Sequence, residues 1–285
     1  MNEQYPLLLQ PLEKPYIWGS EIWSLSCHPS GTCEVLNGTE AGKPLTEVLA
    51  DWGYTDPFPW LIKIINANNP LSVQVHPDDE YAARVENQQG KTEMWYILDS
   101  KENASLIYGF NQALSLEEFE GHIKNGTLGS VVCSVPVQNG DVFFIPAGTL
   151  HAIGAGLKIA EIQQSSDVTY RVWDYDRTDA EGNKRPLHIE KALDVTDRVP
   201  ATVPYGQPQG DVLASCEKFH VEKAALTEEP QPLQAESLCA LLVTEGELTL
   251  TYGDETITAT ESQSILLPPH IPCAVSGKGQ YIKTI

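Results

Sequence analysis

Short runs of β-branched and aromatic residues, each closed by Gly, Pro, Asn or Asp, recur along the first two-thirds of the sequence. The clearest of them cover residues 59–65, 70–76, 93–98, 104–110, 141–146 and 156–164. Runs of this length are too short for ordinary core helices, and their side chains suit a pleated, half-buried surface. Many short strands separated by turn signals are typical of β-barrels and β-sandwiches. The sequence therefore predicts a mainly β protein.

Two segments depart from this pattern and predict helices. In residues 115–126, Ser115 is a favourable N-cap residue, and Glu118 stands three residues later, where it completes a capping box. A shorter helix is predicted within residues 76–87. The helical content is thus a small insertion in a β framework.

The sequence changes character between Thr196 and Asp211, where Pro and Gly are frequent and no periodicity is present. Such a composition marks a linker. The residues that follow it alternate between apolar and polar in short hairpins. The predicted organisation is an N-terminal domain over residues 1–195, a linker over 196–211 and a smaller β domain over 212–285.

The two predicted domains contain related pairs of strands. Residues 139–153 align with residues 261–275 so that the apolar runs coincide and Pro146 falls on Pro268. Cys273 then stands where the first copy has His151. We interpret this as a duplicated β unit whose second copy has lost its histidine and binds no metal.

A histidine motif ends the first of these strand pairs. Its spacing is Gly140-x5-Pro146-x-Gly148-x2-His151. This motif resembles the second motif of the cupin superfamily, in which a Pro-x-Gly turn delivers a histidine into the interior of a jelly-roll β-barrel. The resemblance implies a double cupin, with two jelly-roll barrels and a small helical insertion.

Three further candidate ligands lie upstream of His151. Gln74 and His76 are two residues apart on a predicted strand, so their side chains share one face. Glu93 opens the next predicted strand. Two imidazoles, one carboxylate and one amide oxygen form a mixed site that leaves positions open for water or substrate; zinc tolerates this set, and manganese or iron also accept carboxylate-rich sites. The residues therefore predict one divalent metal ion per chain, in the N-terminal domain, and the ligand types favour zinc only modestly over manganese or iron.

Four longer strings carry a resemblance to one enzyme family. They are residues 71–82 (LSVQVHPDDEYA), 90–98 (GKTEMWYIL), 146–156 (PAGTLHAIGAG) and 165–177 (SSDVTYRVWDYDR). These strings closely resemble the type I mannose-6-phosphate isomerases in their short bacterial form, and residues 16–31 resemble the family's opening segment. The resemblance implies an isomerase that interconverts mannose 6-phosphate and fructose 6-phosphate, with the four candidate ligands binding its zinc.

The same resemblance implies a substrate pocket beside the metal. Its members would be Ser72, Lys63, Lys91, Glu161, Asp167 and Arg171. Isomerisation through a cis-enediol needs a base for the C2 proton and an acid or shuttle for the oxygens. The two lysines, Glu161 and Asp167 all stay open for these roles. Larger family members often have an aromatic residue two positions after the last histidine ligand, where this chain has Ile153, and their helical domain is longer.

A phosphorylated substrate needs positive groups at its site, because the formal net charge of the chain is −21. Arg171 suits this role, since a guanidinium binds phosphate oxygens in pairs, and Ser72 is a second donor. The alternative for Arg171 is a buried ion pair with Asp174 or Asp176. For the two pocket lysines the alternative is a solvated strand end.

The charge also argues against a nucleic-acid partner, because phosphate backbones would be repelled. No apolar run approaches the ~18 residues of a membrane span, and the N-terminal residues are acidic and Pro-containing where a signal peptide would be basic. The six cysteines have no C-x-x-C spacing and are predicted to be free thiols. We expect a cytoplasmic protein that acts on a small sugar phosphate as a monomer or homodimer.

Two other functions stay open at this stage. One is an iron-dependent cupin oxygenase, because the same barrel supports both chemistries. Such sites commonly use two or three histidines, and the pocket lysines would have no task in them. The other is a non-catalytic regulatory protein that binds sugar phosphate. Its sequence sign would be a lost ligand or a lost basic pair, and this chain retains both.

Overall fold

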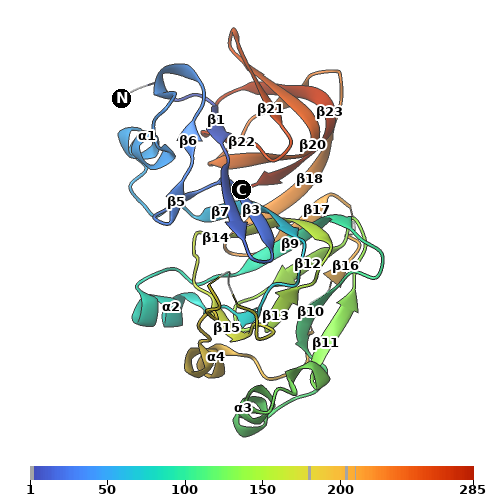
Figure 1. The fold of residues 1–285 in the computed structure, drawn as a ribbon. Coiled ribbons are helices and arrows are strands. Elements are labelled where there is room, and N and C mark those ends of the chain that lie inside the picture. Colours follow the sequence, from blue (N-terminus) through green and yellow to red (C-terminus); the bar gives the residue numbers. More distant parts are fainter. Residues whose placement is uncertain (1–2, 179–180, 203–204, 209) are drawn as a thin grey trace. The chain divides into compact units, whose positions relative to one another are not determined.

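The computed structural model describes residues 3–178, 181–202, 205–208 and 210–285. The chain packs as two units, which we name by their place in the sequence. The terminal unit comprises Met1–Lys14, Glu21–Ile64 and Pro208–Ile285, and the central unit comprises Pro15–Ser20 and Ile65–Gln207. Both are built mainly from β-strands, as predicted (Figure 1).

The central unit contains a five-stranded sheet in the order β11-β10-β13-β8-β15 and a second sheet in which β16, β12, β9 and β14 are neighbours. The pairs are antiparallel, as in Trp95 opposite Glu161. The strands are β8 (Val73–Val75), β9 (Glu93–Ser100), β10 (Ser105–Phe110), β11 (Val132–Pro136), β12 (Val142–Ile145), β13 (His151–Ile153), β14 (Leu157–Gln164), β15 (Tyr170–Trp173) and β16 (Tyr205–Gly206).

Helices in the central unit begin where the sequence supplies caps. The central helices are α2 (Asp79–Glu86), α3 (Leu116–Lys124), η2 (Leu128–Ser130) and α4 (Ile189–Val195). At α3 the Ser115 hydroxyl accepts from the Glu118 N–H, and the Glu118 carboxylate accepts from the Ser115 N–H, so the predicted capping box is confirmed. Asp78 caps α2 by accepting from the Tyr81 N–H at 2.8 Å. The helix predicted within residues 76–87 is therefore confirmed too.

Two apolar clusters form the core of the central unit. One is centred on Trp95, Tyr108 and Phe143. The other, centred on Phe110 and Phe119, packs α3 against the five-stranded sheet. Strands that carry candidate metal ligands thus also contribute to these clusters, as Trp95 of β9 and Ala152 of β13 show.

The terminal unit contains a large antiparallel sheet in the order β17-β18-β23-β20-β22-β1-β6, with β19 on β23 and β21 on β20, and β4 and β5 pair separately. Its elements are β1 (Leu7–Gln10), β4 (Cys27–His28), β5 (Gly31–Thr32), β6 (Glu34–Val35), η1 (Gly38–Glu40), α1 (Leu45–Asp51), β17 (Val212–Ser215), β18 (His220–Leu226), β19 (Gln231–Leu233), β20 (Cys239–Tyr252), β21 (Glu255–Thr260), β22 (Ser264–Leu267) and β23 (Cys273–Thr284). Three more strands run across the boundaries between units along the chain, namely β2 (Leu12–Tyr16), β3 (Gly19–Leu25) and β7 (Trp60–Ala67).

The packing divides the chain differently from the expected boundaries at residues 195 and 212. Residues 1–14 and 21–64, expected in the N-terminal domain, pack with residues 208–285, because β1 pairs with β22 through Leu7 opposite Leu266. The expected linker, residues 196–211, contains β16, which pairs with β12. Residues 203–204 and 209 of that linker lie outside the described part of the chain.

The duplicated strand pairs have the same local layout within their own units. β12 is followed by Pro146 and then by β13, which begins at His151. β22 is followed by Pro268 and then by β23, which begins at Cys273. An apolar cluster that includes Cys273 fills the core of the terminal unit. Cys273 is therefore a core residue of the terminal unit.

Candidate metal centre

The four candidate ligands meet in the central unit because each stands at or beside the end of a strand. Gln74 lies in β8 with His76 directly after it, His151 opens β13 and Glu93 opens β9. His151 pairs with Gln74 across the sheet. The turn before β13 is held by the Gly148 N–H, which donates to the His76 carbonyl at 2.9 Å. Gly148 has φ +88°, and a Cβ there would lie 2.8 Å from the Asp197 carboxylate, so the motif needs glycine.

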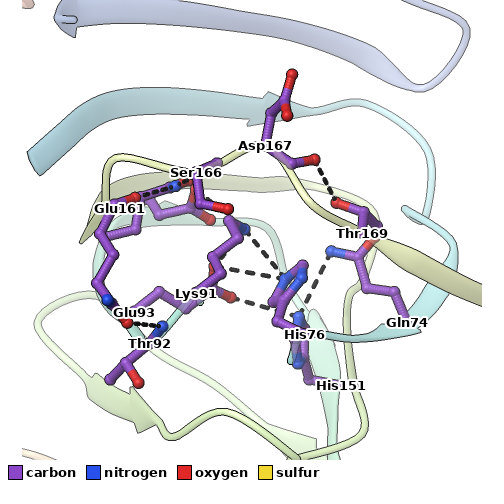
Figure 2. Close-up of polar contacts among 12 residues, drawn as sticks. Gln74, His76, Lys91, Thr92, Glu93, His151, Glu161, Ser166, Asp167 and Thr169 are labelled. Atoms are coloured by element: carbon purple, nitrogen blue, oxygen red, sulfur yellow. Dashed lines mark hydrogen bonds and ion pairs between the residues drawn. The ribbon is translucent and has the colours of Figure 1, made fainter. Parts of the chain in front are cut away.

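The ligating atoms converge on one buried point. His76, Glu93 and His151 each offer an atom, and these atoms all lie within 4.8 Å of one another (Figure 2). His151 Nε2 is 3.3 Å from Glu93 Oε1, and His76 Nε2 is 3.6 Å from Glu93 Oε2. The three side chains are at most 1% exposed. This is a group that could hold a metal ion.

Hydrogen bonds orient both imidazoles toward that point. His76 Nδ1 lies 2.8 Å from the Val168 carbonyl oxygen, and His151 Nδ1 lies 2.9 Å from that of Thr149. A carbonyl only accepts, so each Nδ1 must carry the proton. In the neutral tautomer the Nε2 lone pair then faces Glu93. Backbone anchoring of the outer nitrogen is the usual support of metal-binding histidines, and the donor set fits a divalent cation.

Gln74, the fourth candidate ligand, lies beside His151. Its amide nitrogen lies 3.4 Å from His151 Nε2, and its amide oxygen lies 3.3 Å from the hydroxyl of Ser72, which is buried. The two ends of a carboxamide are exchanged by a half-turn about its last torsion. That rotation would direct the oxygen, the only end that binds metals, toward the site.

Burial lowers the pKa of His151 to about 4 from its ordinary value of 6.5, and the charge of Lys91 adds to this effect. The histidine is therefore neutral at pH 7, as metal binding requires.

This shift predicts an acid-dependent loss of stability in metal-free protein. As the pH falls below 6.5, the unfolded chain takes up a proton at His151 that the folded protein resists down to about pH 4. By pH 4.5 the free energy of unfolding should drop by about 2.5 kcal/mol from this group alone. Urea unfolding at pH 7 and pH 4.5 measures the drop, which should be smaller by that amount in His151→Gln. An equal drop in both proteins would contradict the assignment.

Two titratable pocket residues, Lys91 and Glu161, lie at the cluster. Lys91 is buried and its ammonium donates to Glu93 Oε2 at 2.5 Å, with His76 Nε2 at 3.0 Å (Figure 2). Glu161 Oε1 is 3.9 Å from the same ammonium, and its Oε2 accepts from the Trp95 indole at 2.9 Å. Trp95 also packs edge-on against His151. The site thus holds a cation and a second carboxylate beside the ligand group.

The other two candidate acid–base residues have different surroundings. Lys63 belongs to the terminal unit, where it is buried and ion-paired with Glu21 at 3.5 Å. That arrangement differs from the solvated strand end considered above. Asp167 is exposed, and Figure 2 shows its carboxylate pointing away from His76 and His151.

Arg171 stands directly opposite Gln74 where β15 pairs with β8, so the two side chains share a face of the sheet. Its guanidinium Nε is buried without a hydrogen-bond partner among the described residues. Burial lowers the pKa of Arg171, and the neighbouring charge of Arg185 contributes. Arg171 does not form the ion pair with Asp174 or Asp176 that was the alternative for it. Asp174 instead pairs with Arg177 and Arg185, and Asp176 pairs with Lys184.

Sequence reasoning missed one polar residue that supports the site. Gln164 accepts from the Thr92 N–H at 2.9 Å, between Lys91 and Glu93, and donates to Asp79 of α2 at 2.9 Å. Its signal in the sequence is a glutamine at the end of an otherwise apolar strand. A polar residue at such a position is ambiguous until its partners are known.

Comparisons with known proteins show to which family the chain belongs. The sequence model of the family "Phosphomannose isomerase type I, catalytic domain" matches residues 6–107. The chain is 37% identical to mannose-6-phosphate isomerase of Streptococcus mutans over 92% of both chains, and 37% identical to ManA of Bacillus subtilis over 92% and 93%.

A solved structure extends the likeness to the whole fold. The crystal structure of mannose 6-phosphate isomerase from Bacillus subtilis superposes with a TM-score of 0.89 at 32% identity, covering 99% of this chain and 100% of that one. A structure from Archaeoglobus fulgidus at 20% identity and a TM-score of 0.80 shares the fold. The predicted mainly β, double-cupin fold and the family resemblance are confirmed. The chain belongs to the mannose-6-phosphate isomerase family.

Proposed function

We propose that the protein interconverts mannose 6-phosphate and fructose 6-phosphate with the help of one bound zinc ion. The observation that carries the proposal is the convergence of two imidazole Nε2 atoms, those of His76 and His151, on the buried carboxylate of Glu93. The family to which the chain belongs supports the substrate.

The metal would be held by His76, Glu93 and His151, with the amide oxygen of Gln74 as the fourth ligand. Zinc accepts this mixed set because it imposes little geometry of its own. When bound, it would supply a Lewis acid for the sugar's carbonyl and hydroxyl oxygens, which lowers the barrier to enediol formation by several kcal/mol.

Proton transfer between C1 and C2 falls to groups beside the ligands. Lys91 and Glu161 are both buried at the cluster, and their side chains are 3.9 Å apart. One of them can donate a proton while the other accepts one. The reaction requires this, because protons move between C1 and C2 of the sugar and between the two oxygens on these carbons. Lys63 is ion-paired with Glu21 and Asp167 is exposed, so we assign this role to Lys91 and Glu161.

The phosphate would be bound by Arg171, with Ser72 as a neighbouring donor. Arg171 shares the face of Gln74, and its desolvated guanidinium has no carboxylate within ion-pair distance among the described residues. A charged donor without a protein partner is well suited to an anionic ligand.

The setting is consistent with a cytoplasmic enzyme. All six cysteines are free, as expected in a reducing compartment. In the part of the chain that is described, no helix is long and apolar enough to cross a membrane. We propose a monomer or homodimer with no nucleic-acid partner, because the net charge is −21.

A coupled assay tests the function directly. Purified protein should convert mannose 6-phosphate to fructose 6-phosphate, lose this activity after chelator treatment and recover it when zinc is added back. Elemental analysis should give about one zinc per chain, because the terminal unit has Cys273 in place of a histidine ligand. Failure to convert mannose 6-phosphate in zinc-replete protein would overturn the proposal.

Gln74→Ala should weaken zinc binding less than His76→Ala does. A neutral amide oxygen donates less charge to a dication than an imidazole nitrogen. Zinc retained after graded chelation gives the order of the two variants. The reverse order would show that Gln74 supports the site in a way other than coordination, such as a hydrogen bond to His151.

A further inference from the structure

The chain after β15 folds back on itself and returns to Arg171. The Arg171 N–H donates to His188 Nδ1 at 3.2 Å, and the His188 N–H donates to the Arg171 carbonyl at 2.8 Å. Thr178 and Lys184 form an antiparallel bridge farther along the same hairpin. Residues 184–188 therefore run beside residues 171–178, and this brings Arg185 next to the strand that carries Arg171.

Asp174 fixes Arg185 in this position. Its carboxylate is 5% exposed and accepts from Arg185 Nε at 2.7 Å and from Arg185 Nη2 at 2.6 Å. Burial alone would raise the pKa of Asp174, but the hydrogen bonds from Arg185 and Arg177 lower it overall. The bidentate pair leaves Nη1 of Arg185 without a partner among the described residues.

The same carboxylate holds the turn that follows. Arg177 also donates to Asp174, and its Nη1 donates to the carbonyl of Pro70 at 2.5 Å, just before the strand of Gln74. Between them, Tyr175 and Asp176 both adopt left-handed backbone angles, with φ of 56° and 55°. Two successive non-glycine residues in this region are strained, and such strain persists where surrounding contacts over-determine it and often serves a site.

Positive charge is in excess inside this cluster. Arg171, Arg177 and Arg185 surround the single carboxylate of Asp174, so two positive charges are not compensated locally. The nearby Asp176 is paired with Lys184 on the surface, where the two side chains are 82% and 62% exposed. In a protein with a net charge of −21, a half-buried cluster of this sign is a candidate anion site.

We propose that Arg185 is a second phosphate-binding residue, held beside Arg171 by Asp174, so that two guanidiniums meet the substrate's phosphate dianion. This inference rests on the proposed function. A sugar phosphate carries close to two negative charges at pH 7, and two cations match that charge better than one. Asp174 acts as a positioning residue, since its oxygens bind Arg185 and Arg177 rather than the substrate.

Arg185→Gln tests the proposal, and Lys184→Gln is its matched control. Both remove one positive charge, at adjacent positions of the same hairpin, but Lys184 faces solvent. In zinc-replete protein, the inhibition constant for inorganic phosphate should rise about 10-fold in Arg185→Gln, and kcat/KM for mannose 6-phosphate should fall about 10-fold or more, mostly through KM. Lys184→Gln should stay within 2-fold of wild type, and Arg185→Lys should recover part of the loss.

A charge-specific readout separates binding from general damage. The preference of the wild-type enzyme for phosphate dianion over monoanion, measured as the inhibition constant of inorganic phosphate well above and well below pH 7, should shrink in Arg185→Gln. Asp174→Asn should give the same shift together with a lower melting temperature. If the wild-type protein is active and Arg185→Gln has the same inhibition constant and kcat/KM as Lys184→Gln, this inference alone is overturned. Wild-type protein that neither isomerises mannose 6-phosphate nor is inhibited by phosphate would instead overturn the proposed function.

Discussion

Arg171→Ala should lower kcat/KM for mannose 6-phosphate by at least ~10²-fold while the zinc content stays unchanged. The variant removes a half-buried guanidinium that shares the face of Gln74 and whose Nε has no hydrogen-bond partner among the described residues. Binding energy at the phosphate also fixes the sugar over the metal, so kcat should share the loss. Arg171→Lys should restore only part of the activity, because a point charge cannot replace the planar fork.

Three measurements test this prediction: steady-state kinetics give kcat/KM, elemental analysis gives the zinc content, and a thermal melt shows whether the variant is folded. Arg84→Ala is a suitable control, because Arg84 is an exposed arginine on α2 and its removal changes the net charge equally. A folded, zinc-replete Arg171→Ala with near-normal kcat/KM would contradict the phosphate role. A protein that unfolds would point to a structural role, although Asp174 and Asp176 are already paired with other residues.

The group of His76, Glu93 and His151 could be predicted from the sequence because most of its signals are local. Gln74 and His76 share a face by the two-residue period of a strand, and the Pro-x-Gly turn fixes where His151 begins the next strand. The capping box at Ser115 likewise depends on residues three apart. Each of these features is determined within a few residues, so tertiary packing had little opportunity to change it.

Features that depend on distant pairing could not be read in this way. The sequence of β1 does not reveal that this strand pairs with β22, which lies more than two hundred residues later. This pairing is what places the first strands in the terminal unit. The partners of Asp174 illustrate the same limit. Arg171 is three residues away and looked suitable, but the hairpin delivers Arg177 and Arg185 instead.

The same limit applies to the acid–base candidates. Lys63, Lys91, Glu161 and Asp167 are equivalent as titratable residues on or near predicted strands, and their chemistry alone cannot rank them. Packing separates them, since Lys91 and Glu161 are buried at the ligand cluster while Asp167 is exposed. Lys63 is buried as well, but it pairs with Glu21 in the terminal unit.

His151→Ala should remove most of the zinc and lower kcat by at least ~10³-fold, the equivalent of several kcal/mol of lost Lewis-acid stabilisation. His151 offers its Nε2 to the cluster because its Nδ1 is committed to the Thr149 carbonyl, and alanine leaves no donor in its place. Excess zinc in the assay should restore only a small part of the activity, since Glu93 and His76 would remain as the strong ligands.

Cys273→Ala makes the matched change at the corresponding position of the terminal unit. Cys273 opens β23 as His151 opens β13, and it packs in an apolar cluster. Its replacement should cost some stability through the lost sulfur contacts but leave zinc at about one per chain and kcat unchanged. Zinc analysis and kinetics on both variants decide the matter. Full zinc in His151→Ala would refute its role as a ligand, whereas zinc lost from Cys273→Ala would show that the second copy also holds metal.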